Sequence, residues 1–199
     1  MRFDLQIIAS WIENGARVLD LGCGEGDLLY FLKQNKQVIG TGIDHDESNV
    51  AKSIERGLSV MQGDINKEIN DYPDDYFDYA ILSQTLQQVY KPADLIQSLL
   101  RIGKKGIVSF PNFSHISIRL QLLINGYAPV TEELPYEWYD TPNIRVITIK
   151  DFHKFSKDIG FEITKEVAIN TYRPNKKRVI TFLPNLLATY GIFQISKRK

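Results

Sequence analysis

The stretch VLDLGCGEGD, Val18 to Asp27, decides the fold of this 199-residue chain. Its apolar first half predicts a buried strand, and DLLYFLKQ, residues 27–34, predicts a helix directly after it. Gly22, Gly24 and Gly26 fall between the two. Glycine permits tight backbone dihedrals and lets a ligand approach the main chain closely. The stretch therefore predicts a ligand-binding turn between a strand and a helix of an α/β sheet.

The charges around this turn indicate which ligand it takes. The spacing is G-x-G-x-G, whereas the dinucleotide fingerprint is G-x-G-x-x-G. Asp20 lies in the turn, with Glu25 and Asp27 close behind, so a pyrophosphate would meet several carboxylates. S-adenosylmethionine instead brings an ammonium and a sulfonium, which carboxylates attract. We therefore expect Asp20 to bind this cofactor, whereas Glu25 and Asp27 are explained more simply by the dipole of the following helix.

Two further acidic residues follow the next two expected strands. Asp44 ends the second strand, 18 positions after Gly26, which suits a carboxylate that accepts hydrogen bonds from ribose hydroxyls. Its alternative role, as a helix N-cap, is better served by Asp46. Asp64 follows the third strand, where an acidic group can accept from the adenine amino group; a surface turn is the alternative.

Strands and helices alternate through the first half of the chain. We expect Asp4 to cap the first helix and Gly15 to end it, and Gly103 to end the fourth helix. The expected helices cover residues 4–14, 27–34, 46–56 and 92–102, and the expected strands 17–22, 37–44, 58–62, 77–83 and 106–110. This alternation implies βαβ units and a parallel sheet.

The alternation breaks after Pro111. A helix over 115–127, with Ile116, Leu120, Leu123 and Tyr127 on one stripe, is followed by an irregular stretch, a helix over 150–160, and strands over 161–172 and 190–196. We therefore predict one domain over residues 1–199, an α/β fold with a doubly wound, mostly parallel, seven-stranded sheet and a last antiparallel strand. An insertion of about forty residues, 111–149, follows the fifth strand and leaves the sheet at its expected ligand-binding edge.

Composition narrows the class of protein further. Lys+Arg and Asp+Glu both number 24, so no net field favours nucleic acid or an anionic membrane as a partner. Two short basic runs, Asn175–Arg178 and Lys197–Lys199, are expected to be a solvated turn and tail. The single cysteine, Cys23, permits no internal disulfide and no zinc site with Cys spacing, so we expect no metal. The N-terminal apolar run is short and interrupted by charge, so we expect a cytoplasmic protein without a membrane span.

The order of these motifs resembles class I S-adenosylmethionine-dependent methyltransferases over nearly the whole chain. That resemblance implies a last strand that lies antiparallel beside the fifth. It assigns Asp20 and the backbone of the first two glycines to the methionine moiety, Asp44 to the ribose, and Asp64 with the Ile65 amide to adenine. The residues expected around the cofactor are Asp20, Gly22, Cys23, Gly24, Gly26, Asp44, His45, Asp64, Ile65 and Ser83.

Three other segments resemble a narrower family. ILSQTLQQVYKP (81–92), IVSFPNF (107–113) and LPYEWYDTPNIR (134–145) are similar to the methionine-biosynthesis MetW family, and nothing in a generic methyltransferase requires them. Members of that family are associated with homoserine O-acyltransferases in the first committed step of methionine synthesis. The resemblance therefore implies a protein partner as well as a cofactor.

The sequence leaves the role of the chain open between two hypotheses. The fourth strand ends in Ser83-Gln84-Thr85, not in the amino-methylating signature [ND]-P-P-Y, so no base is evident. This favours an accessory or regulatory subunit of a homoserine O-acyltransferase, and the absence of G-x-S-x-G argues against the acyltransferase itself. Gln84 and His115, the two candidates for catalysis, favour a conventional methyltransferase for a small molecule. A nicotinamide enzyme is disfavoured by Asp20.

The stretch from Leu134 to Arg145 follows neither a helical nor a strand period. Rigid aromatic residues and an arginine are the composition of interface hot spots. We expect part of the stretch to close the acceptor side of the site, and Tyr136, Trp138, Tyr139 and Arg145 to contribute to binding the acyltransferase. The alternative is a cap that packs only against its own protein.

Overall fold

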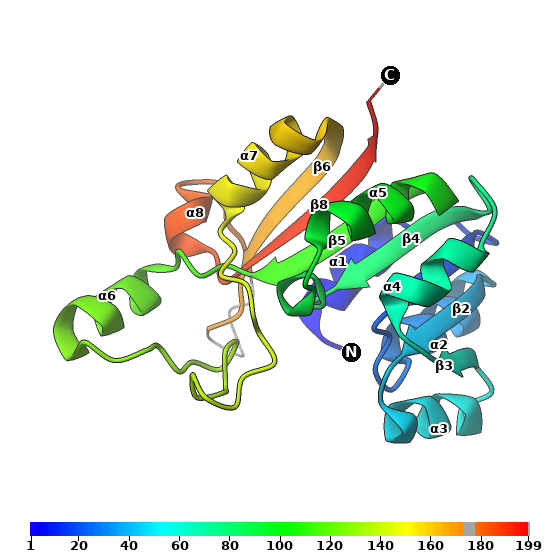
Figure 1. Ribbon diagram of the computed structural model, residues 1–199, viewed down its shortest axis with the longest axis horizontal. Helices are drawn as coiled ribbons and strands as arrows, with labels where there is room; N and C mark the ends of the chain where they lie inside the picture. The colour runs from blue at the N-terminus through cyan, green and yellow to red at the C-terminus, as the bar shows by residue number, and fades with distance from the viewer. Residues whose placement is uncertain (173–177, 199) are drawn as a thin grey trace.

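The computed structural model describes residues 1–172 and 178–198, and within them the chain forms one eight-stranded sheet of order β3-β2-β1-β4-β5-β8-β6-β7 (Figure 1). Two segments of the expected basic runs, residues 175–177 and 199, lie outside the described residues. The parallel strands are β1 (Arg17–Leu21), β2 (Ile39–Asp44), β3 (Ser59–Gln62), β4 (Phe77–Ser83) and β5 (Gly103–Pro111). The remaining strands are β6 (Phe161–Asn170), β7 (Arg178–Val179) and β8 (Tyr190–Lys197).

Helices cover both faces of the sheet because strand residues alternate between two apolar clusters. Val18 joins the cluster that contains α1 (Phe3–Trp11) and α2 (Asp27–Lys36), and Leu19 joins the cluster that contains α5 (Pro92–Ile102) and α7 (Ile149–Ile159). The other helical segments are α3 (Glu47–Glu55), α4 (Ile65–Glu68), η1 (Ile69–Asp71), η2 (Leu86–Gln88), α6 (Ile116–Asn125) and α8 (Pro184–Leu187).

The predicted fold class is confirmed. β8 lies antiparallel beside β5, as the resemblance implies, and it also pairs antiparallel with β6. The two-residue strand β7 on the edge of β6 is the one strand beyond the seven predicted, among the residues described. Residues 112–148 connect β5 to α7, and Figure 1 shows α6 projecting from this connection away from the sheet.

Two local predictions about α1 are wrong. Asp4 does not cap α1, which has Arg2 at its N-cap; its buried carboxylate instead accepts a hydrogen bond from Gln84 Nε2 at 2.8 Å. The helix ends at Trp11, well before Gly15. Gly103 ends α5 as predicted, and β5 begins at the same residue, earlier than expected, because its first residues pair with β4.

The apolar stripe of α6 is present but is not packed against the protein. Leu120, Leu123 and Tyr127 are exposed, and Ile118 is the one buried residue of this ten-residue helix. A helix gains most of its stability by packing an apolar face. The helix therefore presents an unpartnered apolar surface, which the sequence pattern alone did not reveal.

Candidate functional site

A cleft of about 660 Å³ lies at the carboxyl ends of β1, β2 and β4. Its walls are the glycine turn after β1, the end of β2, the segment from β4 to η2, and part of the insertion. Arg2, Leu5, Leu28, Asn49 and Tyr190 also line it. Ligands of open α/β sheets bind at this edge, so the cleft lies where the topology predicts it.

The glycine turn has a shape that other residues would disturb. Gly22, Gly24 and Gly26 all have positive φ, at 76°, 55° and 74°. A Cβ on Gly22 would lie 2.5 Å from Thr85 Oγ1, so this glycine allows the β4–η2 segment to pack against the turn. A Cβ on Gly24 would meet nothing within 4 Å. The Gly24 backbone therefore borders open space in the cleft, as close approach of a ligand requires.

Asp44 joins the end of β2 to this turn. Its Oδ2 accepts from the Gly24 N–H at 2.7 Å, and its Oδ1 accepts from the Asp46 N–H at 3.0 Å. The carboxylate is buried but lines the cleft. Asp46 caps α3, as predicted, by accepting from the Asn49 N–H. Asp44 Oδ1 also accepts from the Asn49 side-chain amide at 3.5 Å, so Oδ2 is the oxygen that keeps a second lone pair for a hydroxyl donor of a ligand.

Asp20 is the most unusual group in the cleft. Its side chain is 3% exposed, and its Oδ1 has no hydrogen-bond partner among the described residues. Burial raises the pKa of Asp20 to about 7, Arg2 opposes this rise, and the charge of Asp44 adds to it. A buried carboxylate oxygen without a donor is costly, so the site is organised to receive a donor or a cation from a ligand.

The other residues expected around the glycine turn lie in the cleft in supporting positions. Cys23 packs against the strand below, and burial raises the pKa of its thiol, so it is an unreactive small residue. His45 is exposed on the rim, and the Ser83 hydroxyl is 3.1 Å from that of Ser109. Glu25 and Asp27 form ion pairs with Lys52 and Arg56 of the α3 region.

Asp64 and Ile65 lie outside the lining of the cleft. Asp64 caps α4, and its carboxylate accepts from both the backbone N–H and the side-chain amide of Asn66. These bonds lower the pKa of Asp64. Ile65 packs against the apolar core. Their assignment to adenine therefore stays a prediction.

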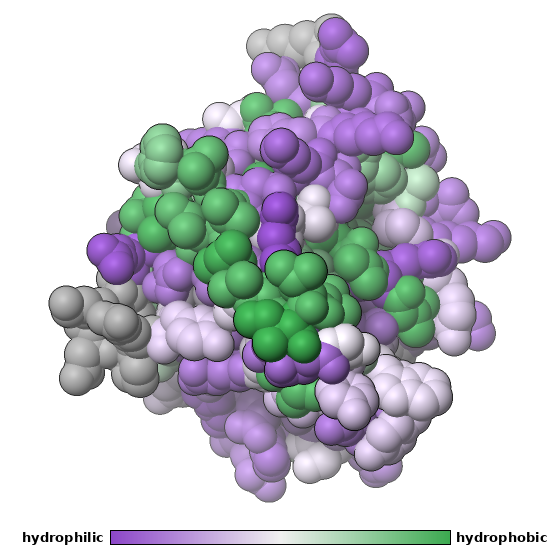
Figure 2. All heavy atoms as spheres, turned by 90° about the vertical axis from the view of Figure 1, so that its left-hand side faces the viewer, coloured by the Kyte–Doolittle hydropathy of each residue, from purple (hydrophilic) through white to green (hydrophobic). Residues whose placement is uncertain are grey.

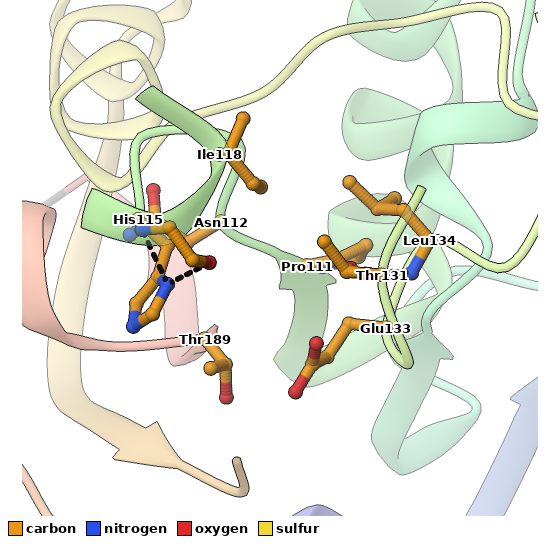
Figure 3. Close-up of a pocket in the computed structure, with 9 residues that line it drawn as sticks. Pro111, Asn112, His115, Ile118, Thr131, Glu133, Leu134 and Thr189 are labelled. Carbon is orange, nitrogen blue, oxygen red and sulfur yellow. Dashed lines mark hydrogen bonds between the residues drawn. The ribbon is translucent and has the colours of Figure 1, made fainter. Parts of the chain in front are cut away.

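The two catalytic candidates are separated by the structure. Gln84 lines the cleft in a left-handed conformation, with φ at 55°, and donates its amide to Asp4. His115 does not line the cleft but a separate cavity of about 10 Å³. Figure 3 shows this cavity, with His115 and Thr189 on one side of it and Thr131 and Leu134 on the other.

His115 has a structural role in this position. It caps α6 by accepting from the Ser117 N–H, and its Nδ1 is also 2.7 Å from the Ser117 hydroxyl. Its Nε2 is 3.4 Å from the Asn170 amide, and its ring stacks on Tyr172. Burial lowers the pKa of His115. Both ring nitrogens are engaged within the protein, so His115 has no evident route to a ligand in the cleft.

The expected contact residues of the insertion divide between its two sides. Tyr136 lines the cleft, whereas Trp138 and Tyr139 are exposed. Arg145 donates from its guanidinium to the carbonyl oxygens of Val89 and Tyr90, so its charged group fixes the insertion to η2.

Sequence reasoning missed several residues that line the cleft. Tyr190 had a usable signal, since an antiparallel strand begins where its parallel neighbour ends, and Tyr190 pairs with Pro111. Arg2, Glu132, Glu133 and Asn143 depend on how the N-terminus and the insertion fold back, which no local pattern encodes. Gln87 of η2 was also missed, although it closely follows the expected Ser83-Gln84-Thr85 segment.

The fold and the cleft define a class I S-adenosylmethionine-dependent methyltransferase fold. A methyltransferase of this kind from Thermotoga maritima superposes with a TM-score of 0.71 at 20% identity, over 98% of this chain and 87% of its own. Another from Archaeoglobus fulgidus also gives 0.71, at 18% identity, over 97% and 91%. The family described as "Methionine biosynthesis protein MetW" matches residues 2–195, and the chain belongs to this family.

Curated relatives extend this picture. The bifunctional methionine biosynthesis protein MetXA/MetW of Rhodopirellula baltica is 33% identical over 176 residues, which are 84% of this chain. The ubiquinone/menaquinone biosynthesis C-methyltransferase UbiE of Vibrio vulnificus is 33% identical over 109 residues, or 50% of this chain. These matches span 28% and 42% of the length of the two relatives. In the described part of this chain, no helix is long and apolar enough to cross a membrane, and no side-chain cluster suits a metal ion.

Proposed function

We propose that the cleft binds S-adenosylmethionine. The observation that carries this proposal is the buried Asp20 carboxylate, which has an unpartnered oxygen beside a glycine turn open to the cleft. Six carboxylates line the cleft, against Arg2 as the one Lys or Arg among its described lining residues. This charge suits a cationic ligand. The six are Asp20, Glu25, Asp27, Asp44, Glu132 and Glu133.

The donor set fits the parts of this cofactor. Asp20 and the glycine turn would hold the methionine moiety, and Asp44 would accept from a ribose hydroxyl through the free lone pair of its Oδ2. When bound, the cofactor supplies an electrophilic methyl group on a sulfonium. The residues of the chain bind and orient it, which is most of what methyl transfer requires.

A thermal-shift experiment tests cofactor choice. S-adenosylmethionine and S-adenosylhomocysteine should raise the melting temperature, because a ligand selective for the folded state stabilises it. NAD should not, because its pyrophosphate meets the carboxylates of the turn. Stabilisation by NAD alone would refute the assignment.

We further propose that the protein is an accessory or regulatory subunit of a homoserine O-acyltransferase, acting in the cytoplasm. The name of the Rhodopirellula relative pairs MetXA with MetW in one protein, which supports a functional link. The end of β4, Ser83-Gln84-Thr85, offers hydroxyl and amide groups but no base, which supports a role other than turnover. The surface around α6 supports a protein partner.

That surface, which we name the α6 face, is apolar and exposed. It consists of Leu120, Leu122, Leu123, Ile124, Tyr127, Val130 and Trp138. Figure 2 views the molecule from the side on which α6 projects, and hydrophobic residues gather at its centre. Tyr127, Val130 and Trp138 also line a common surface hollow. Contiguous exposed apolar surface of this kind marks interaction sites, and aromatic residues are its usual anchors.

Copurification with the homoserine O-acyltransferase of the same host tests this role. Leu123→Lys should abolish capture, because it places a charge at the position of a side chain that is 81% exposed in the last turn of α6. Ile54→Lys on α3 is the matched control, since it changes another exposed aliphatic residue of a helix far from α6. Normal capture by Leu123→Lys, or equal loss in both variants, would contradict docking on the α6 face.

A conventional methyltransferase for a small molecule is the second candidate, favoured by Gln84 in the cleft. This alternative predicts release of S-adenosylhomocysteine with a small acceptor and without the acyltransferase. Turnover of that kind by the isolated protein, abolished by Gln84→Ala with an intact fold, would support it over the accessory role.

A further inference from the structure

The insertion side of the cleft contains a second group of polar atoms without partners. Four buried side-chain atoms in the described residues lack a hydrogen bond, and three of them line this cleft. Asp20 Oδ1 belongs to the cofactor site proposed above. The other two are Gln87 Oε1, on η2, and Asn143 Oδ1, on the insertion. Clustering of unpartnered acceptors in one cleft indicates a ligand that supplies donors.

The orientation of the Gln87 amide is fixed by its surroundings. The side chain is 4% exposed, and its Nε2 donates to the carbonyl oxygen of Gln84 at 2.7 Å. A carbonyl oxygen can only accept, so the nitrogen must occupy that end of the amide and the oxygen the other end. Gln87 Oε1 is therefore an acceptor in a fixed position, because the hydrogen bond from Nε2 to Gln84 holds the amide group.

The insertion is joined to the same residue. The carbonyl oxygen of Gln87 accepts from the backbone N–H groups of Ile144 and Arg145, at 3.0 and 2.9 Å. Asn143 directly precedes these two residues, so its side chain and that of Gln87 come from two segments hydrogen-bonded to each other. The two side chains with unpartnered oxygens therefore come from neighbouring parts of the cleft wall.

The charges and aromatic rings of the cleft indicate the kind of donor. Glu132 and Glu133 of the insertion line the same cleft, and the Glu133 carboxylate is held by a hydrogen bond from Thr171 Oγ1 at 2.9 Å. Tyr136 and Tyr190 also line the cleft, and aromatic rings attract cations. Water can satisfy the two amide oxygens. A group with several N–H donors and a positive charge can in addition pair with the carboxylates.

We propose that this region, the amine subsite formed by Gln87, Asn143, Glu132 and Glu133, binds the ammonium group of a primary amine. The amine is a second ligand, separate from S-adenosylmethionine. This proposal rests on the proposed function only in placing the amine beside the cofactor in the same cleft. An ammonium carries three donors, enough for both amide oxygens and one carboxylate. The subsite disfavours an anionic group at the same position, because its acceptors and carboxylates would repel it.

A matched series of small probes tests the charge. The titrants are n-butylamine, butan-1-ol and butanoate, which share a chain length and differ in the terminal group. Each is titrated by NMR into the protein saturated with S-adenosylhomocysteine, and separately into the free protein. Only n-butylamine should bind saturably, and it should shift the side-chain amide resonances of Gln87 and Asn143.

Two substitutions and one control test the residues. Gln87→Met and Asn143→Ala should each weaken n-butylamine by about tenfold or more, the expected loss of a hydrogen bond to a charged group. The control is Gln194→Met, because Gln194 Oε1 is the fourth unpartnered buried acceptor, is equally buried, and lies outside the cleft. It should leave n-butylamine binding unchanged.

The outcomes separate the subsite from the cofactor site. Unchanged n-butylamine binding in both Gln87→Met and Asn143→Ala would mean a general attraction to the acidic cleft and would overturn the proposal. Equal binding of butan-1-ol, or no binding of n-butylamine, would mean that the two oxygens face water only. A parallel loss of S-adenosylhomocysteine affinity would assign Gln87 to the cofactor. Binding of n-butylamine to a protein that takes no S-adenosyl ligand would refute the proposed cofactor and keep the subsite.

Discussion

Replacement of Asp20 by asparagine should make the protein more stable and its cofactor site weaker. Asparagine has nearly the shape of aspartic acid and carries no charge at any pH. The Asp20 carboxyl is buried, and one of its oxygens has no partner in the described structure. Ionised Asp20 therefore lowers the free energy of unfolding, and Asp20→Asn removes this destabilisation.

The magnitude follows from the pKa. Burial raises the pKa of Asp20 to about 7 in the folded protein, from an ordinary value of 3.8. Between these values the folded state binds more protons than the unfolded state, so the free energy of unfolding falls as pH rises from about 4 to about 7. At 1.36 kcal/mol per pKa unit, ionised Asp20 costs at most about 4 kcal/mol above pH 7. Asp20→Asn should recover up to that amount at pH 8 and little at pH 4.

Urea unfolding at pH 4, 5, 6, 7 and 8 measures this difference. Asp46→Asn is the matched control, because asparagine also caps helices and Asp46 is exposed at the start of α3. Calorimetry at pH 8 should show S-adenosylmethionine weakened at least about tenfold by Asp20→Asn, because the charge that attracts the sulfonium is gone. A variant that is less stable than the parent at pH 8 would refute the reasoning, since it would mean that Asp20 has a donor in the folded protein.

Four further predictions follow from the same contacts. Asp44→Ala should weaken the affinity for S-adenosylmethionine by roughly tenfold to a hundredfold in calorimetry, and unchanged affinity would mean that the ribose binds elsewhere. The same change should lower stability to urea, because the Gly24 and Asp46 N–H groups lose their acceptors. Gly22→Ala should destabilise the protein more than Gly24→Ala, because only the first places a Cβ against Thr85, and equal melting temperatures would contradict this packing. Arg145→Ala should make residues 127–140 more sensitive to limited proteolysis, because its bonds to Val89 and Tyr90 hold the insertion; unchanged cleavage would mean that other contacts hold it. If S-adenosylhomocysteine changes the affinity of the acyltransferase, the acyltransferase must change the affinity of S-adenosylhomocysteine by the same factor, and unequal factors in two calorimetric titrations would exclude a single coupled equilibrium.

The parallel half of the sheet was predictable because its signals are local. Each βα unit carries an apolar strand, a helical period and a turn residue, and these agree with one another along the first 111 residues. The binding edge follows from that topology. Asp20 and Asp44 could therefore be assigned to the cleft from sequence alone, since strand ends that are distant in the chain meet at one edge.

Residue type alone did not give the hydrogen-bond partners of three polar side chains. Asp4 has the residue type of a helix cap, but a partner 80 positions away, Gln84, makes it a buried acceptor. Asp64 has the position of an adenine acceptor; its Oδ1 takes both local bonds from Asn66, and its role at adenine stays a prediction. His115 has the chemistry of a base, and in the structure it caps the start of α6. In each case the residue type is compatible with two roles.

The insertion was recognisable as irregular, but its two-sided arrangement depends on how it is held. Backbone bonds to Gln87 and the Arg145 guanidinium fix its returning part against η2, which turns Tyr136 and Asn143 toward the cleft. The same anchoring leaves Trp138, 74% exposed, on the outer side next to α6. The aromatic residues of the insertion therefore face two different surfaces. A helical or strand period would be expected only if the segment packed a single face against the protein. One segment thus borders both the ligand cleft and the α6 face, so a ligand that shifts its position must also change the surface offered to a partner.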